Sequence, residues 1–145
     1  MKKVNTCRKL LLRLLLIMSM TMVVETTLAD SSSAVNSLLN DAKIYYEGKE
    51  YEQAAVSLER ALRIEPRHPI LWHNLAGVRL AQEDWTRAIN LALKSNALVG
   101  NKKKYKDLRV RNWVVITQAC DGKKDENCAK DARNRAQALV QRLED

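Results

Sequence analysis

The sequence predicts an all-α protein built from antiparallel helix pairs. It has only four glycines and two prolines in 145 residues, and the residue types that cost least in a helix are abundant. Two segments superpose without a gap at a spacing of 34 residues, which indicates a repeated structural unit. Polar turn sequences at residues 47–50 and 82–84 divide each unit into two helices. A hydrophobic fraction of 46% and a charged fraction of 29% are typical of one small globular domain.

The first 29 residues have the three parts of a secretory signal peptide. Five basic residues precede position 14, and the apolar run 14–24 follows them. This run is shorter than the about 20 residues that a membrane-spanning helix needs. The small residues Thr27 and Ala29 predict cleavage after Ala29. The mature protein would then be exported and periplasmic, and would begin at Asp30.

An uncleaved N-terminal anchor in the inner membrane is the alternative, and it would also leave the domain facing the periplasm. A lipid anchor is not expected, because Cys7 precedes the apolar run instead of following it. Residues 30–34 contain Asp30 and three serines. They are predicted to form a polar lead-in that caps the first helix.

The net charge of +8 overstates the basicity of the folded part. Five basic residues and one acidic residue precede position 30, which leaves 20 basic and 16 acidic residues after it. This surplus is well short of the concentrated basic face of a nucleic-acid-binding protein, so no nucleic acid is expected as a partner.

The densest basic run of the mature chain lies at residues 102–111. As a solvated loop between repeats it would have no partner, whereas as a patch it would bind anionic lipid or an acidic protein surface. Both interpretations remain open. The residues of this basic patch are Lys102, Lys103, Lys104, Lys106, Arg109 and Arg111.

The two superposed segments share a pattern of aromatic, small and bulky positions. In the first segment these are Tyr45, Tyr51, Ala54, Leu58, Ala61 and Pro66. In the second they are Trp72, Leu75, Ala76, Trp85, Ala88 and Ser95. Small residues let helix backbones approach, and the larger side chains fill the space between them. The pattern resembles the tetratricopeptide repeat (TPR) family, and more narrowly short secreted TPR proteins of Gram-negative bacteria.

The resemblance implies a right-handed superhelical stack of antiparallel helix pairs over residues 35–143. Two repeats are clear, at about 35–68 and 69–102. A third, degenerate repeat at about 110–143 aligns Trp113 with Trp72 once about seven extra residues are allowed between units. These extra residues form a basic insertion near 101–109.

The resemblance also implies a concave groove formed by the first helix of each pair, which would bind a protein or peptide partner. The function expected is a non-catalytic scaffold of the bacterial cell envelope. The alternative is a membrane-surface protein held by an uncleaved anchor and the basic loop. The residues expected to line the groove are Leu39, Lys43, Tyr46, His73, Gly77, Leu80, Arg111, Val114 and Gln118.

The sequence offers little support for catalysis or metal binding. It contains no Ser-His-Asp order, phosphate-binding loop or paired-carboxylate motif, so neither an enzyme activity nor a cofactor is expected. His68 and His73 are five residues apart and do not share a helix face, so no metal site is expected.

Two cysteines of the third repeat are predicted to pair. Export to an oxidising compartment makes a disulfide between Cys120 and Cys128 the expected state, because the alignment places them on facing helices. Two separate buried thiols are the alternative.

Overall fold

The computed structural model describes the backbone of residues 23–144 and the side chains of residues 32–141. This part of the chain contains α-helices, one 3-10 turn and no strand, which confirms the all-α prediction. The elements are α2 (Val23–Glu47), α3 (Tyr51–Ile64), α4 (Pro69–Ala81), α5 (Trp85–Val99), η1 (Lys103–Tyr105), α6 (Lys106–Gly122) and α7 (Glu126–Glu144). The chain divides into two units, residues 1–36 and 37–145, and the second unit contains the stack of helix pairs.

The three turns inside the helix pairs have the same backbone geometry. In each, the second residue after the helix end has a positive φ: 60° at Lys49, 58° at Glu83 and 59° at Lys124. In each, the next amide N–H bonds back to the carbonyl five residues earlier, at 2.8 Å from Glu50 to Tyr45 and at 2.9 Å in the other two turns. This Schellman-type closure satisfies carbonyls at the helix ends. The degenerate third pair therefore closes in the same way as the two clear repeats.

The start of α2 differs from the prediction. In the full chain residues 30–34 lie inside this helix, which begins at Val23, and do not form the separate polar lead-in expected of a chain that begins at Asp30. The physical reason is that no glycine or proline interrupts residues 23–47, and nothing local ends the helix there. The predicted signal peptide lies mostly in residues 1–22, outside the described part. No helix within residues 23–144 is sufficiently long and apolar to span a membrane.

The predicted basic insertion is partly helical. Residues 103–105 form η1, and α6 begins at Lys106 within the segment expected to be a loop. Leu108 is only 2% exposed, and Asp107 lies in the first turn, where a carboxylate is favourable. Burial of Leu108 thus explains why the helix starts earlier than residue 110.

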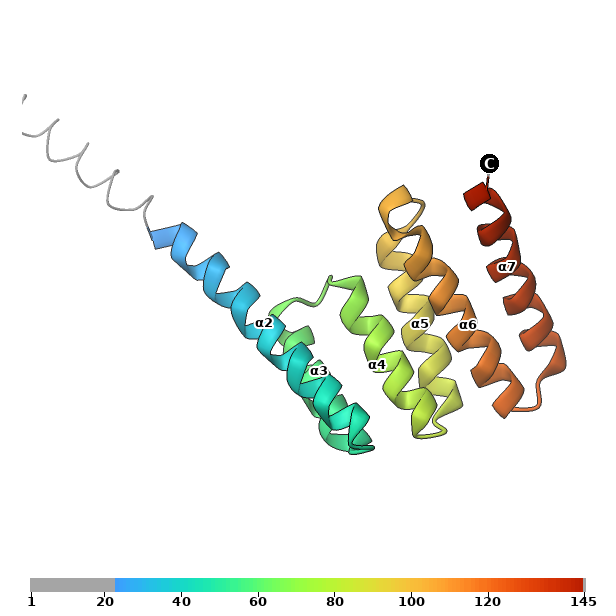
Figure 1. Cartoon of the computed structure of the whole chain (residues 1–145), viewed down its shortest axis with the longest axis horizontal. Coiled ribbons are helices and arrows are strands. Elements are labelled where there is room, and N and C mark those ends of the chain that lie inside the picture. The colour runs from blue at the N-terminus through green and yellow to red at the C-terminus, as the bar shows by residue number, and fades with distance from the viewer. Residues whose placement is uncertain (1–22, 145) are drawn as a thin grey trace, which may run out of the picture. The chain divides into compact units, whose positions relative to one another are not determined.

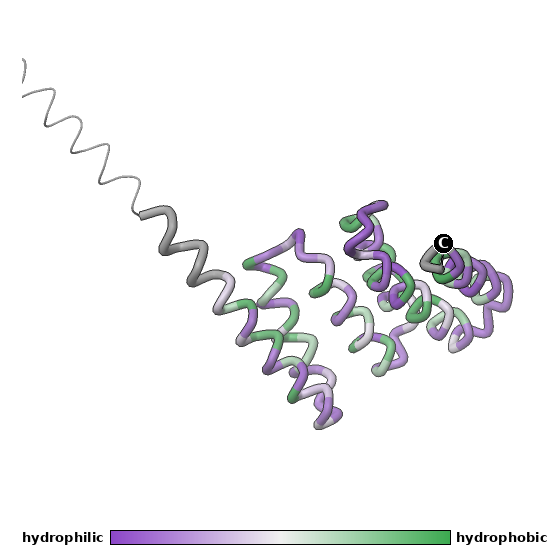
Figure 2. Tube along the Cα trace, turned by 45° about the horizontal axis from the view of Figure 1, so that its top comes forward, coloured by the Kyte–Doolittle hydropathy of each residue, from purple (hydrophilic) through white to green (hydrophobic). Residues whose placement is uncertain are grey.

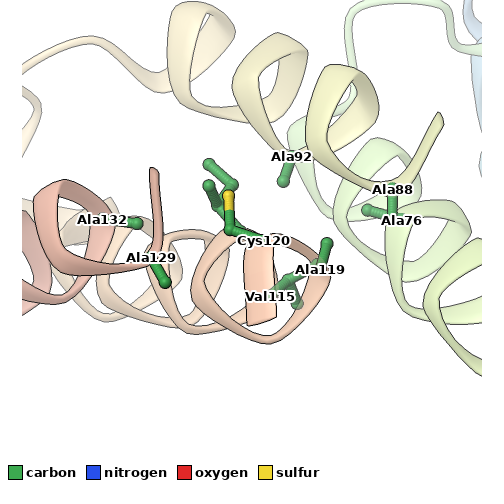
Figure 3. Close-up of a cluster of buried hydrophobic side chains, with 9 residues drawn as sticks. Ala76, Ala88, Ala92, Val115, Ala119, Cys120, Ala129 and Ala132 are labelled. Carbon is green, nitrogen blue, oxygen red and sulfur yellow. The ribbon is translucent and has the colours of Figure 1, made fainter. Parts of the chain in front are cut away.

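Small side chains fill the spaces between the helices. Ala54, Ala61, Ala76 and Ala88 are fully buried, which confirms their predicted place between helix backbones. Figure 3 shows part of this core, where short side chains of four helices meet. Larger side chains close its margins, among them Leu80, Trp85 and Trp113. The last helix, α7, is mostly hydrophilic in Figure 2, as expected for a helix that ends a stack.

Successive helices of the second unit run in opposite directions (Figure 1). One edge of the stack therefore carries the α3–α4 and α5–α6 connections, and we call it the linker edge. The opposite edge carries the α2–α3, α4–α5 and α6–α7 turns, and we call it the turn edge.

Candidate functional site

A cavity of about 400 Å³ opens between α3, α4 and the 37–47 part of α2. We call it the groove pocket. Five of the predicted groove residues line it together. The lining residues are Leu39, Ala42, Lys43, Tyr46, Leu58, His73, Asn74, Gly77 and Val78.

Gly77 leaves one wall of the groove pocket without a side chain. A Cβ atom placed on Gly77 would meet no other atom within 4 Å, so open space lies above this position. Glycine inside a helix costs about 0.5–1 kcal/mol relative to alanine. Its effect here is to give the pocket depth against the α4 backbone.

The α2 side of the pocket combines an aromatic ring and a cation. Tyr46 is 44% exposed, and its ring lies 5.4 Å from the ring centroid of Tyr51 at a tilt of 56°. Lys43 lies 3.8 Å from Glu47, but both side chains are well exposed, so this ion pair contributes little to stability. Both Tyr46 and Lys43 can therefore reach an incoming ligand.

The opposite side of the pocket is held by a buried polar network. His73 Nδ1 lies 2.7 Å from Asn112 Oδ1, and Asn112 Nδ2 donates to Ser95 Oγ at 2.8 Å. The other hydrogen of Asn112 Nδ2 is donated to Asn96 Oδ1 at 2.9 Å. Ser95 Oγ in turn donates to the Pro69 carbonyl at 2.9 Å. The network joins α4, α5 and α6, so it sets the position of His73 in the pocket wall.

The network also assigns the protons of His73. Because Asn112 Oδ1 can only accept, Nδ1 of His73 must carry the donated proton. Burial lowers the pKa of His73, the Asn112 hydrogen bond opposes that shift, and the charge of Arg111 lowers the pKa further. The neutral ring then presents Nε2 as an acceptor. The wall of the groove pocket thus contains a neutral imidazole with one unprotonated nitrogen.

Asn112 and Ser95 were not among the predicted site residues. Asn112 is fully buried, and it shares a face of α6 with Leu108 and Val115, which lie four residues before and three after it. That helical spacing is the signal that could have identified a buried polar residue.

The other predicted groove residues lie outside the pocket. Arg111, Val114 and Gln118 are exposed along α6, and Arg111 is close enough to affect the pKa of His73. Leu80 instead packs against the buried alanine cluster. It follows Ala76 by four residues and so shares the inward face of α4 with it.

The predicted basic patch is divided by the structure. Lys102, Lys103 and Lys104 are exposed at the linker edge, whereas Lys106 begins α6. Arg109 donates to the Gly100 carbonyl at 3.2 Å and to Asn101 Oδ1 at 2.9 Å, so it closes the end of α5. Arg111 lies near enough to His73 to lower the pKa of that ring. The three consecutive lysines are therefore the part of the patch that is exposed at the linker edge.

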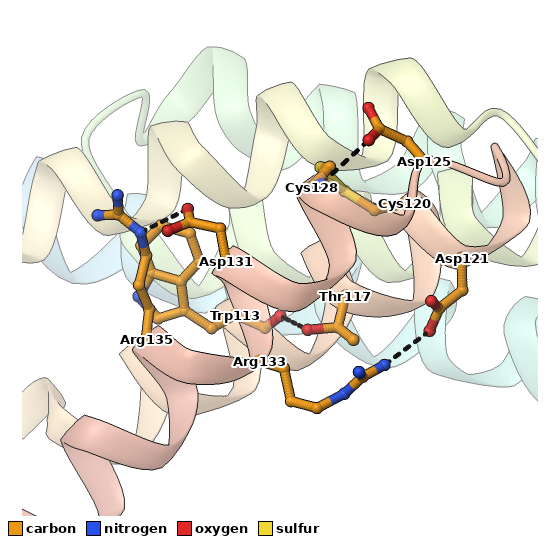
Figure 4. Close-up of a disulfide and its surroundings, with 9 residues drawn as sticks. All are labelled: Trp113, Thr117, Cys120, Asp121, Asp125, Cys128, Asp131, Arg133 and Arg135. Carbon is orange, nitrogen blue, oxygen red and sulfur yellow. Dashed lines mark hydrogen bonds and ion pairs between the residues drawn. A yellow bond between two sulfur atoms is a disulfide. The ribbon is translucent and has the colours of Figure 1, made fainter.

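A disulfide joins Cys120 of α6 to Cys128 of α7 (Figure 4). Their Cα atoms are 5.7 Å apart, within the range that a disulfide spans. Asp125 accepts a hydrogen bond from the backbone N–H of Cys128 at 3.0 Å, which caps the start of α7.

The two histidines have separate surroundings, since His68 lies 4.0 Å from Glu65 in the α3–α4 connection.

The chain is similar to known proteins in its sequence pattern and in its fold. The family model described as TPR repeat matches residues 42–83, which include most of the groove-pocket lining. The globular C-terminal domain of P. aeruginosa LpoP has 34% sequence identity and a TM-score of 0.67, and the match covers 71% of this chain and 94% of that one. The N-terminal domain of C. elegans stress-induced protein-1 (STI-1) has 16% identity and a TM-score of 0.69, over 79% of this chain and 94% of that one, and shows the fold alone. No curated protein sequence matches the chain.

Proposed function

The chain belongs to the tetratricopeptide repeat family, and we propose that it is a non-catalytic scaffold that binds a protein or peptide partner of the bacterial envelope through the groove pocket. TPR domains bind protein or peptide partners. The observation that carries the proposal is the groove pocket itself, in which five predicted groove residues meet around a space of about 400 Å³.

The lining indicates the chemistry of the partner. Leu39, Leu58 and Val78 make the inner wall apolar, so the pocket suits one apolar anchor side chain of the partner. Lys43, Asn74 and His73 supply polar side chains at the same site. Such groups fix the orientation of a bound segment, while the apolar anchor supplies most of the affinity.

Filling the pocket from inside tests this proposal. Gly77→Leu starts a side chain at a point in the pocket wall where a Cβ atom would meet no other atom within 4 Å, so it should block the anchor without unfolding the stack. The partner is first isolated by pull-down from envelope extract with the full chain, and its affinity for each variant is then measured by titration. Tyr46→Ala should weaken binding by about 1 kcal/mol or more if Tyr46 contacts the anchor.

The matched control is Asn90→Leu, which adds a leucine to an exposed position of α5. Melting curves must show that both leucine variants remain folded. At least tenfold weaker binding by Gly77→Leu, with unchanged binding by Asn90→Leu, supports the groove pocket. Equal affinity of both variants for the partner would exclude it.

The sequence of residues 1–29 supports export to the periplasm as part of the same proposal. The alternative, a membrane-surface protein that keeps its N-terminal anchor, predicts a different fractionation. Release of the protein with the soluble periplasm favours the exported scaffold, and retention with membranes favours the anchored form.

A further inference from the structure

Charge is segregated between the two edges of the helix stack. The connections of the linker edge, residues 63–68 and 100–109, contain seven Lys or Arg residues and two acidic residues. The turns of the opposite edge, residues 47–52, 81–86 and 121–126, contain eight acidic residues and three lysines. The helices α3 to α6, which run between the edges, are about 20–25 Å long at 1.5 Å per residue. The connections and turns thus give the stack a positive and a negative edge.

Several cations of the linker edge have no partner. Within the described part of the chain, no ion pair or hydrogen bond engages the side chains of Arg67, Lys102 or Lys103, and all three are exposed. Lys104 lies 4.8 Å above the ring of Tyr105 and is also exposed. Their charge is therefore available to an external anion.

The two basic connections lie beside each other. A cavity of about 390 Å³ is lined by Arg67 and His68 from the α3–α4 connection and by Tyr105 from η1. Trp72 donates its indole N–H to the Pro66 carbonyl at 2.8 Å, and Lys94 lies 5.9 Å above its ring. Two aromatic rings with cations near them thus accompany the lysines, and aromatic and basic side chains together are typical of surfaces at lipid headgroups.

We propose that the linker edge docks on an anionic lipid surface, with the acidic turn edge turned away from it. Exposed lysines on a short turn provide separate point charges, which suit a broad layer of headgroup phosphates. The acidic edge at the far end adds repulsion in the reverse orientation, so the charge separation selects one orientation.

The chain enters the second unit on the side of the linker edge. Helix α2 reaches the turn edge at its last residue, Glu47. The second unit begins earlier in this helix, at Ser37, which therefore lies toward the linker edge. The apolar run 14–24 precedes that entry point in the sequence. This surface is separate from the groove pocket, so neither proposal depends on the other.

Amine footprinting of the full chain tests the proposal, whether or not the N-terminal segment also binds the membrane. The protein is mixed with vesicles of phosphatidylcholine alone, or with vesicles that also contain phosphatidylglycerol, and its lysines are then acetylated. Mass spectrometry measures the extent of labelling at each lysine. Labelling of Lys102, Lys103 and Lys104 should fall several-fold only with phosphatidylglycerol. Lys123 and Lys124, at the turn edge, are the control within the same molecule and should be labelled equally on both vesicles.

Matched charge variants give the second measurement. Lys102→Gln, Lys103→Gln and Lys104→Gln are combined in one protein, and Lys49→Gln, Lys123→Gln and Lys124→Gln in another, so that both lose three positive charges. Each cation near an anionic surface is worth about fivefold in partitioning, so the first protein should lose about 100-fold of its phosphatidylglycerol-dependent binding. The second should bind like the original chain.

Three results would overturn the proposal. These are equal labelling of the two lysine groups on anionic vesicles, equal losses in the two triple variants, and no preference for phosphatidylglycerol. Binding of polyglutamate that depends on Lys102, Lys103 and Lys104, without binding of anionic vesicles, would assign the edge to an acidic protein instead.

Discussion

Gly122 at the end of α6 lies directly against the indole ring of Trp85 at the start of α5. A Cβ atom on Gly122 would meet two ring carbons of Trp85 at 2.8 Å, closer than side chains pack. Trp85 also packs against the buried alanine cluster, so its ring cannot move away freely. The second and third helix pairs can therefore pack at this depth only because residue 122 has no side chain.

Gly122→Ala is expected to destabilise the protein by about 1–3 kcal/mol, because the added methyl group overpacks the contact with Trp85. Gly77→Ala is the matched control, because its methyl group would meet no other atom. This substitution also replaces a glycine inside a helix, so it should stabilise the protein by about 0.5–1 kcal/mol. Urea denaturation of both variants measures the two changes. Equal stabilities of the two variants would show that Trp85 yields to the methyl group.

Asn112→Ala is expected to cost about 3 kcal/mol, because it leaves the buried Nδ1–H of His73 without its acceptor and opens a small cavity. Asn90→Ala makes the same truncation on an exposed face of α5 and should change stability by less than about 0.5 kcal/mol. Denaturant unfolding measures the free energy of unfolding of both variants. A loss below 1 kcal/mol for Asn112→Ala would mean that water replaces the network.

His73 should make stability depend on pH. Its pKa is lowered in the folded state by burial, so below about pH 6.5 the unfolded chain binds a proton that the folded chain still excludes. The free energy of unfolding therefore decreases as the pH falls from 6.5 toward the lowered pKa, by at most about 1.4 kcal/mol per pH unit.

This slope is measured by denaturant unfolding at a series of pH values. His73→Gln should remove the contribution of His73 to this slope. The control His68→Gln should leave that contribution unchanged. A slope that is unchanged in His73→Gln would assign the pH dependence to other groups.

Reduction of the Cys120–Cys128 disulfide is expected to lower the free energy of unfolding by about 2.5 kcal/mol, from the entropy of a short loop. Stability is measured with and without a reductant. The double variant Cys120→Ala and Cys128→Ala should be insensitive to the reductant, and Cys7 is present in both proteins. Free thiols at both positions in protein from an oxidising compartment, detected by mass spectrometry, would contradict the pairing.

Signal processing should remove residues 1–29. The intact mass of protein from the envelope fraction should then correspond to a chain beginning at Asp30. Because α2 begins at Val23, cleavage would place the new N-terminus inside this helix and bring Ser31, Ser32 and Ser33 into its first turn. A mass that includes Met1 would favour the anchored alternative.

Much of the architecture could be read from local patterns. The turns at residues 47–50 and 82–84, the boundary between the repeats at residues 68 and 69, and the four buried alanines lie where the 34-residue repeat predicts them. Each of these depends on backbone preferences and helical periodicity within about 20 residues, which the order of residue types contains directly. The resemblance to the TPR family implied that Leu39, Tyr46 and Gly77 lie on the groove, and all three line the groove pocket.

The remaining features depend on how the helices pack on one another. Leu80 turns toward the alanine cluster, Asn112 reaches His73 across 39 residues of sequence, and Gly122 meets Trp85 across 37. Such contacts depend on the rotation and depth at which helices stack, and the final side-chain fit determines both. The repeat pattern determined the helices and their order in this protein, and tertiary packing determined which polar groups are buried together and which face the pocket.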